Sequence, residues 1–243
     1  MKPYIAIYST FMQRCIDMIQ HDAALQKLPV RFCMDRAGLS PDDGPTHHGL
    51  FDIAMIRSIP NIVFRPPKDE ADSVHIPRTT NHHQNGPTVI RYPRGCGAGT
   101  PVPAKAEILP IGKAEVLQTG QDVTLVSLGT MIGIARETAS LLEARGYTVT
   151  LINARFIKPL DDECIRRHAA RSRVVCTFED HSISGGFNSA VLESLETGDV
   201  KTPVEAIAWP DQFIEHGSES ILRKKYGLTA EAALQKIIPH LNS

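Results

Sequence analysis

The stretch VRFCMDRAGLSPDDGPTHHG, residues 30–49, decides the fold class of this chain. Val30 to Met34 is predicted to be a strand, and glycines and prolines break the rest of the stretch into a loop. That loop carries a guanidinium, carboxylates and imidazoles, with Arg36, Asp43 and His47 among them. A charged loop directly after a buried strand is where an open α/β sheet binds its ligands. A solvated surface loop is the alternative, and the neighbouring segments decide between the two.

Strand and helix patterns alternate along the chain. The first half has expected strands at 4–8, 30–34, 61–65 and 88–92, with helices at 12–19 and 51–59. The second half has expected strands at 123–128, 148–152, 174–178 and 204–208, with helices at 134–142, 161–170, 187–195 and 233–241. Such alternation is typical of parallel sheets. The prediction is therefore an α/β protein of two layers, with mostly parallel sheet, joined by a linker rich in glycine and proline.

Composition argues against several classes of protein. The chain has 243 residues, a formal net charge of −1 and 42% hydrophobic residues, as in a soluble globular protein. Lysine and arginine are spread along it, so no nucleic-acid partner is predicted. No apolar run approaches the ~20 residues of a membrane span, and no signal peptide is evident. Five widely spaced cysteines indicate reduced thiols and a cytoplasmic location.

The segment from Tyr8 to Arg14 joins the first strand to the first helix, at an edge where open α/β sheets bind ligands. Tyr8 and Phe11 offer rings on which a heterocycle can stack. The alternative is that Ser9 or Thr10 only caps the helix.

Two arginines, Arg91 and Arg94, end the last strand of the first half. A guanidinium binds phosphate or carboxylate through two parallel hydrogen bonds, so the pair suits an anionic ligand. Arg36 ends another strand, and if the two strands are neighbours, Arg36 and Arg94 can converge on one phosphate. The alternative is an ion pair with an acidic neighbour, Asp69 or Glu70.

Histidine occurs in two adjacent pairs, His47-His48 and His82-His83. Adjacent side chains in an extended loop point apart, and no i, i+4 pair or CxxC accompanies them, so no metal site is predicted. His47 is better suited to relay protons, because imidazole titrates near neutrality.

The loop from Glu179 to Gly186 also joins a strand to a helix. A ligand at that helix N-terminus is one hypothesis. A plain connection without a ligand is the preferred one.

Six segments together resemble the 1-deoxy-D-xylulose-5-phosphate synthases, a thiamine-diphosphate family of the transketolase superfamily. They are IAIYSTFMQRCIDMIQHDAALQKLPV, DRAGLSPDDGPTHHGLFDIA, GPTVIRYPRG, LPIGKAEV, FIKPLDDECI and WPDQFIEHG, and they run in family order. The resemblance implies a partial transketolase-like pyrimidine-binding domain at 1–95, a linker at 96–112 and a transketolase C-terminal domain at 113–243.

The family condenses pyruvate with glyceraldehyde 3-phosphate and releases carbon dioxide. By this resemblance, Phe11 would stack on the aminopyrimidine of the cofactor. Tyr8 would flank the pyruvate adduct, and Arg14 would line the site.

The same resemblance implies an acceptor site for the phosphorylated aldehyde. Arg36 and Arg94 would hold its phosphate, His47 would relay protons, and Asp43 would form a hydrogen bond to the acceptor.

The chain also departs from the family pattern. It lacks the GDG…N motif that binds the cofactor diphosphate and magnesium, and the opening strand and helix with the glutamate that activates the aminopyrimidine. Met1-Lys2-Pro3 resembles an internal family segment, so the chain is expected to begin within the pyrimidine-binding domain. We therefore expect that it does not bind thiamine diphosphate and magnesium alone. Pro77 lies where the family has a helix and predicts a broken helix or local drift.

Three functions stay open from the sequence. The first is a part of the synthase that acts as a homodimer or with a chain carrying the missing N-terminal half. The second is a β-type subunit of a 2-oxo-acid dehydrogenase, whose acceptor is lipoyl-lysine; Arg36 and Arg94 favour the phosphorylated acceptor instead. The third is a catalytically silent interaction module.

Overall fold

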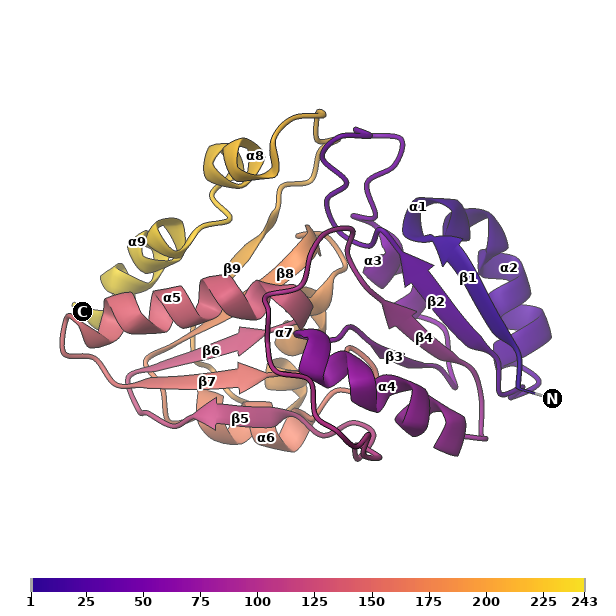
Figure 1. Ribbon diagram of the computed structural model, residues 1–243. Helices are drawn as coiled ribbons and strands as arrows, with labels where there is room; N and C mark the ends of the chain where they lie inside the picture. The colour runs from indigo at the N-terminus through magenta and orange to yellow at the C-terminus, as the bar shows by residue number, and fades with distance from the viewer. Residues whose placement is uncertain (1, 243) are drawn as a thin grey trace.

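Four parallel strands form the first sheet, in the order β1-β2-β4-β3. The computed structural model describes residues 2–242, and Figure 1 draws this sheet in indigo to purple. Strand β1 lies at the edge and is largely exposed, whereas β4 in the interior is buried throughout. The strands are β1 (Tyr4–Tyr8), β2 (Arg31–Asp35), β3 (Val63–Arg65) and β4 (Thr88–Arg91).

The helix expected after β1 is a succession of short helical segments. They are α1 (Ser9–Met12), the 3-10 turn η1 (Gln13–Cys15), α2 (Ile16–Met18) and the π-helical η2 (Ile19–Ala24). Met12 and Ile19 are buried, while Cys15 and Ile16 pack against the same core, so the predicted apolar face is confirmed.

Two further helices belong to the first half, α3 (Asp52–Arg57) and α4 (Glu70–His82). Helix α4 is continuous through Pro77, so the predicted break is wrong. Contacts on both sides of the proline hold the helix. Asp72 pairs with the buried Arg65 at 2.6 Å, and Thr80 O accepts from Arg31 at 2.9 Å. These contacts offset part of the ~3 kcal/mol that an interior proline costs a helix.

The second sheet has five strands in the order β5-β7-β6-β8-β9. Four are parallel, and β5 pairs antiparallel to β7 with a bulge between Val116 and Gln118. Together the two sheets confirm the predicted α/β class with mostly parallel strands. The strands are β5 (Glu115–Gln118), β6 (Val123–Ser127), β7 (Val149–Asn153), β8 (Val174–Ser182) and β9 (Val204–Trp209).

Helices cover both faces of the second sheet. Helix α5 packs on α9 over one face, and α6 packs on α7 over the other (Figure 1). The helices are α5 (Ile132–Glu143) after the 3-10 turn η3 (Gly129–Met131), α6 (Asp162–Ala169), α7 (Phe187–Thr197), α8 (Glu219–Tyr226) and α9 (Ala230–Leu241). Strand β5 and helices α4 and α8 were not expected from the sequence patterns.

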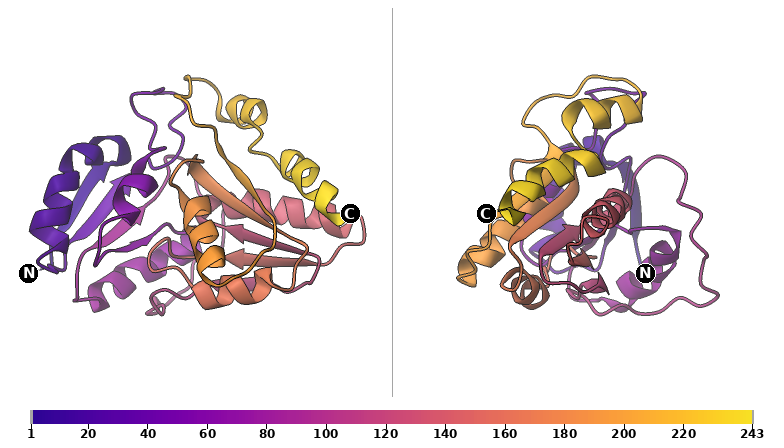
Figure 2. Two further views of the ribbon diagram at one scale, coloured as in Figure 1. Left: turned by 180° about the vertical axis from the view of Figure 1, so that it is seen from behind. Right: turned by 90° about the vertical axis from the view of Figure 1, so that its left-hand side faces the viewer.

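The two sheets lie side by side, with the chain ends at opposite sides of the molecule (Figure 2). Phe64 of β3 joins them, because its N–H donates to Lys158 O at 2.8 Å and its carbonyl accepts from Ile157 N at 2.9 Å. One apolar core contains Met34 and Phe64 together with Val126 of the second sheet. Residues 92–114 connect β4 to β5 without a helix or strand.

Candidate active site

The carboxyl ends of three neighbouring strands, β1, β2 and β4, meet at one edge of the first sheet. Tyr8 is level with Asp35, and Met34 is level with Arg91. The register therefore brings the segments after these strands together, as parallel pairing requires.

Arg36 and Arg94 meet at one carboxylate in this edge. Arg36 Nη1 forms an ion pair with Asp43 Oδ2, and Arg94 Nη1 lies 3.5 Å from the same oxygen. Arg94 also pairs with Asp42 at 3.0 Å. The two arginines thus lie close together and form ion pairs with acidic neighbours, which are Asp42 and Asp43 rather than Asp69 or Glu70. Their predicted convergence on a phosphate stays a prediction.

The aromatic side chains continue the cluster from Arg36. Its guanidinium lies 4.3 Å from the centre of the Tyr8 ring, within the range of cation–π attraction. Tyr8 stacks on Phe11 with ring centres 5.6 Å apart, and Phe11 meets His47 edge-on at 5.5 Å. Phe11 keeps 37% of its surface exposed, so the cluster offers an aromatic surface to a ligand.

The structure therefore brings together most of the sequence-predicted site residues. Arg14 is the exception: it lies exposed in η1 and has no hydrogen bond or ion pair within residues 2–242. The residues in the cluster are Tyr8, Phe11, Arg36, Asp43, His47 and Arg94.

The two adjacent histidines have different environments. His47 is half-buried, and its Nδ1 lies 2.9 Å from the Thr46 hydroxyl. His48 is buried; its Nδ1 accepts from Ser40 N at 3.0 Å and its Nε2 lies 3.4 Å from Glu215 O. Burial lowers the pKa of His48 below its ordinary value, so its neutral form holds the loop.

Loop 38–49 is closed at its base by two glycines. Gly38 N donates to Gly49 O at 2.9 Å, and Gly49 N donates to Gly38 O at 2.8 Å. Gly38 has a φ of +84°, and a Cβ there would lie 2.2 Å from Asp180 Oδ2. A Cβ at Gly49 would lie 2.5 Å from Ser9 Oγ, so both positions require glycine.

A buried ion pair beneath the cluster was missed by the sequence reasoning. Asp52, the first residue of α3, accepts from Arg91 Nε at 3.0 Å and from the Ser9 hydroxyl at 2.9 Å. Arg91 was named as a possible anion ligand, but it serves this internal carboxylate. The sequence signal for Asp52 is an acidic residue at the start of a helix. This signal does not indicate that Arg91 is its partner.

The connection from β8 to α7 is bridged by Glu179, a residue of β8 itself. Glu179 accepts from Phe187 N at 2.6 Å and Asn188 N at 2.8 Å at the start of α7. The strand–loop–helix connection itself is present, and the backbone N–H groups of Phe187 and Asn188 at the helix start are bound by Glu179. Burial raises the pKa of Glu179 to about 7.

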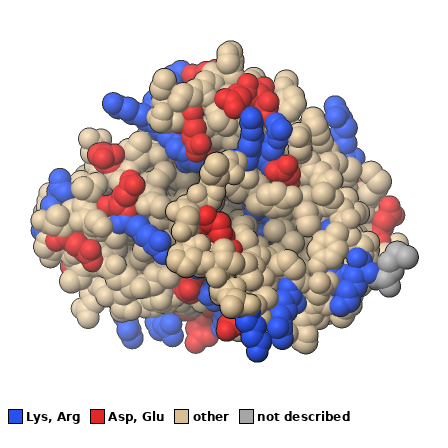
Figure 3. Space-filling model, viewed as in Figure 1, with Lys and Arg blue, Asp and Glu red and all other residues tan. Residues whose placement is uncertain are grey.

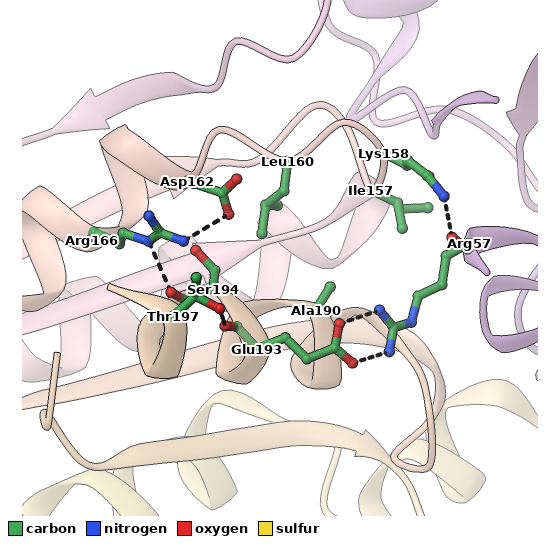
Figure 4. Close-up of a pocket in the computed structure, with 10 residues that line it drawn as sticks. All are labelled: Arg57, Ile157, Lys158, Leu160, Asp162, Arg166, Ala190, Glu193, Ser194 and Thr197. Atoms are coloured by element: carbon green, nitrogen blue, oxygen red, sulfur yellow. Dashed lines mark hydrogen bonds and ion pairs between the residues drawn. The ribbon is translucent and has the colours of Figure 1, made fainter. Parts of the chain in front are cut away.

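A separate cavity of about 380 Å³ lies between α3, α6 and α7. Figure 4 shows its cations directed at protein partners: Arg57 pairs with Glu193, and Lys158 Nζ donates to the Arg57 carbonyl. Arg166 Nε likewise donates to Ser194 O at 2.8 Å. The Arg57 and Lys158 contacts join the two halves of the chain, and the Arg166 contact lies within the second half.

Residues 2–242 also bear on metal binding, membrane insertion and surface charge. No group of three or more His, Cys, Asp or Glu side chains there is placed to hold a metal ion. None of the helices in that range is both long and apolar enough to cross a membrane. Lysine and arginine side chains are mixed with acidic ones over the face shown in Figure 3.

Comparison with known proteins identifies the family. Residues 1–98 match the transketolase pyrimidine binding domain, and residues 112–232 match the transketolase C-terminal domain. The chain belongs to the transketolase family. A solved structure described as a split gene transketolase, inactive beta4 tetramer, has a TM-score of 0.85 at 30% identity and covers 99% of this chain and 76% of that one.

A second solved structure, transketolase from Campylobacter jejuni, shares the fold with a TM-score of 0.76. Its identity is 17%, over 98% of this chain and 35% of that one.

Curated relatives carry the name 1-deoxy-D-xylulose-5-phosphate synthase, so the predicted resemblance is confirmed. The synthase of Methylacidiphilum infernorum is 51% identical over 245 residues, 100% of this chain and 39% of that protein. The synthase of Acidobacterium capsulatum is 51% identical over 240 residues, 99% of this chain and 38% of that protein. This transketolase-family chain thus spans about two fifths of the length of these relatives.

Proposed function

We propose that this chain forms the acceptor-binding part of a 1-deoxy-D-xylulose-5-phosphate synthase. The reaction condenses pyruvate with glyceraldehyde 3-phosphate and releases carbon dioxide. The observation that carries the proposal is the convergence of Arg36 and Arg94 on Asp43 Oδ2. Two guanidinium groups directed at one oxygen form a site suited to a phosphate, and Asp43 holds them in place until the phosphate arrives.

The aromatic cluster supports the cofactor side of the proposal. Phe11 is backed by Tyr8 and partly exposed, which fits stacking against an aminopyrimidine. Thiamine diphosphate supplies an electron sink for the pyruvate-derived carbanion when it is bound. No cluster of candidate metal ligands lies within residues 2–242. As the family resemblance implies, we propose that polypeptide outside these residues binds the diphosphate and magnesium.

His47 and Asp43 are the polar groups that face the acceptor side of the cluster. His47 touches Phe11 and has a hydroxyl partner in Thr46, so its ring is oriented toward the cluster. We assign it the proton transfer to and from the acceptor carbonyl oxygen, and we assign Asp43 a hydrogen bond to the acceptor hydroxyl. Arg14 keeps its assignment as a residue that lines the site.

Assembly completes the proposal. We propose that this chain acts as a homodimer or with a chain that carries the rest of the synthase, as its resemblance to the family implies. A split gene transketolase described as a tetramer supports such an arrangement. We further propose domains at 1–95 and 113–243 with a linker at 96–112. The free cysteines fit a reducing, cytoplasmic location.

Steady-state kinetics of the chain with the remaining polypeptide tests the proposal, with both substrates varied. A hydrogen bond to a charged group contributes ~1.5–3 kcal/mol, so Arg36→Ala or Arg94→Ala should raise KM for glyceraldehyde 3-phosphate by roughly ten- to a hundredfold. KM for pyruvate should stay unchanged. Arg36→Lys should restore only part of the loss, because lysine lacks the bidentate fork.

Arg145→Ala is the matched control, since Arg145 is exposed on the second half and its guanidinium, within residues 2–242, bonds only to the Leu141 carbonyl. It should leave both KM values unchanged. Equal losses for both substrates in the Arg36 and Arg94 variants would refute the phosphate assignment and favour a 2-oxo-acid dehydrogenase subunit. No turnover with any supplied polypeptide would favour the silent interaction module.

A further inference from the structure

Residues of the second half hold loop 38–49 at both its base and its tip. Toward the tip, Gly217 N donates to Pro41 O at 3.1 Å, and a Cβ at Gly44 would lie 3.1 Å from His216 Cβ. Next to the base, His48 Nε2 lies 3.4 Å from Glu215 O. At the base, Asp180 of β8 lies against Gly38. The loop that carries Asp43 and His47 is therefore seated on the second sheet and the segment that follows it.

Asp180 is the centre of the contacts at the base. Its Oδ1 accepts from the Trp209 indole N–H at 2.6 Å. Its Oδ2 lies 3.4 Å from Leu39 N and 3.4 Å from Arg223 Nη2. Asp180 is 7% exposed and Trp209 is fully buried, so water does not replace these contacts.

The three groups that bond to the Asp180 side chain, from Trp209, Leu39 and Arg223, are all donors. A carboxylate satisfies them because both of its oxygens accept. An amide of the same shape cannot, since its NH₂ would face either the Trp209 N–H or the N–H groups of Leu39 and Arg223. The surrounding structure thus requires the charge of Asp180 and not only its volume.

The base of the loop is also hydrogen-bonded to the end of β4 and to the segment that leads from β4 to Arg94. Arg91 Nη2 donates to the backbone carbonyl of Asp180 at 3.2 Å and to Gly49 O at 3.3 Å. Ala37 N donates to Tyr92 O at 3.0 Å, two residues before Arg94. These bonds connect Asp180 to the backbone next to Arg36 on one side and to the segment before Arg94 on the other.

We propose that Asp180 is a positioning residue of the acceptor site. It touches no substrate; it fixes the base of loop 38–49 and so sets where Asp43 and His47 stand relative to Arg36. The proposal gives the second sheet a part in the chemistry of the first. It rests on the proposed function of Arg36 and Arg94 as phosphate ligands.

Hydrogen exchange of the chain, followed by mass spectrometry, tests the positioning without any substrate. Asp180→Asn should speed exchange of the amides in loop 38–49 by about tenfold or more, because contacts to a charged group are lost. Asp122→Asn is the matched control. Asp122 accepts from Thr148 N at 2.7 Å and from the Thr148 hydroxyl at 2.6 Å. It directly precedes β6, at the amino-terminal end of the parallel strands of the same sheet. It should leave the exchange of the loop unchanged.

A second variant keeps the test open if Asp180→Asn does not fold. Gly38→Ala places a methyl group against the Asp180 carboxylate at a backbone position with φ of +84°, and it should speed exchange in the same loop. Loop exchange at the wild-type rate in both variants would overturn the proposal.

Kinetics of the complete enzyme measures KM for glyceraldehyde 3-phosphate, which would not change if Asp180 only stabilised the fold. Asp180→Asn should raise KM for glyceraldehyde 3-phosphate about tenfold, by the same reasoning as for the arginines, and leave KM for pyruvate unchanged. A loss of folded enzyme would instead lower kcat and leave both KM values as they are, and that result would overturn the proposal.

The failure of the proposed function is separately visible. If Arg36→Ala does not raise KM for glyceraldehyde 3-phosphate, the phosphate assignment is wrong. The hydrogen-exchange experiment still reports on Asp180 in that case.

Discussion

Arg91 and Asp52 form a buried ion pair between β4 and α3, directly beneath the candidate site. Arg91 Nε lies 3.0 Å from Asp52 Oδ2, and Arg91 Nη2 lies 3.1 Å from Asp52 Oδ1. The side chains are only 6% and 1% exposed. The Ser9 hydroxyl donates to the carboxylate, and Gly49 O accepts from the guanidinium, so the charges have partners on both sides. The pair thus ties together the segments after β1, β2 and β4.

Breaking this ion pair should destabilise the chain strongly. Asp52→Ala leaves the Arg91 charge buried without its partner, and such a loss amounts to about 3–5 kcal/mol. Urea unfolding of the wild type and the variant measures the free energy of unfolding. The double variant Asp52→Leu with Arg91→Met removes both charges and should be less destabilised than Asp52→Ala. An Asp52→Ala protein as stable as the wild type would show that the pair contributes nothing.

Glu179 should make the chain less stable as the pH rises from about 4.5 to about 7. Burial raises its folded pKa to about 7 from an ordinary 4.5, so the folded state keeps a proton that the unfolded state has lost. One such proton changes the free energy of unfolding by about 1.4 kcal/mol per pH unit. Glu179→Gln should remove this dependence, and urea unfolding at several pH values measures it. An identical pH slope in the variant would contradict the assignment.

His48 should act in the opposite direction, on the acid side of its ordinary pKa of 6.5. Burial lowers the pKa of His48 in the folded state, so below pH 6.5 the unfolded state binds a proton more readily than the folded state does. Its stabilisation is present above pH 6.5 and is lost as the pH falls. His48→Asn keeps an acceptor near Ser40 N and should flatten this loss between pH 6.5 and 5, measured by urea unfolding. His21→Asn, at an exposed histidine bonded to Asp17, is the control that should retain it.

Much of the candidate site could be predicted from the sequence because it depends on parallel strands. Tyr8, Arg36 and Arg94 follow three such strands, and parallel pairing alone brings their carboxyl ends to one edge. Asp180 could not be predicted in this way. It lies 141 positions from Leu39 in the sequence, and their contact depends on how the second sheet packs against the first.

The elements that the sequence patterns missed have similar causes. Pro77 predicted a break in α4, but Asp72 and Thr80 anchor the helix through the distant residues Arg65 and Arg31. Strand β5 is short, antiparallel and interrupted by a bulge, so it lacks the apolar run of the other strands. Local rules describe local preferences, and tertiary contacts override them where a buried partner is available.

The isolated chain should associate through the exposed side of β1 and η2. An apolar cavity of about 250 Å³ opens there, lined by Ile5, Met18 and Leu28 among others. Ile5 is 43% exposed and Met18 is 50% exposed, and β1 presents an unpaired strand edge. Exposed apolar patches and free edges of this kind promote association. Light scattering should therefore show a dimer or a larger species at micromolar concentration.

A pair of variants locates the contact. Met18→Lys places a charge in the apolar cavity and should shift the chain toward monomer, because an ammonium group resists burial in an apolar interface. Ile221→Lys is the matched control: Ile221 is 66% exposed on α8 in the second half, and its replacement should leave the association unchanged. A wild-type chain that stays monomeric across the concentration range would contradict the prediction. A shift to monomer with Ile221→Lys but not with Met18→Lys would instead place the interface on α8.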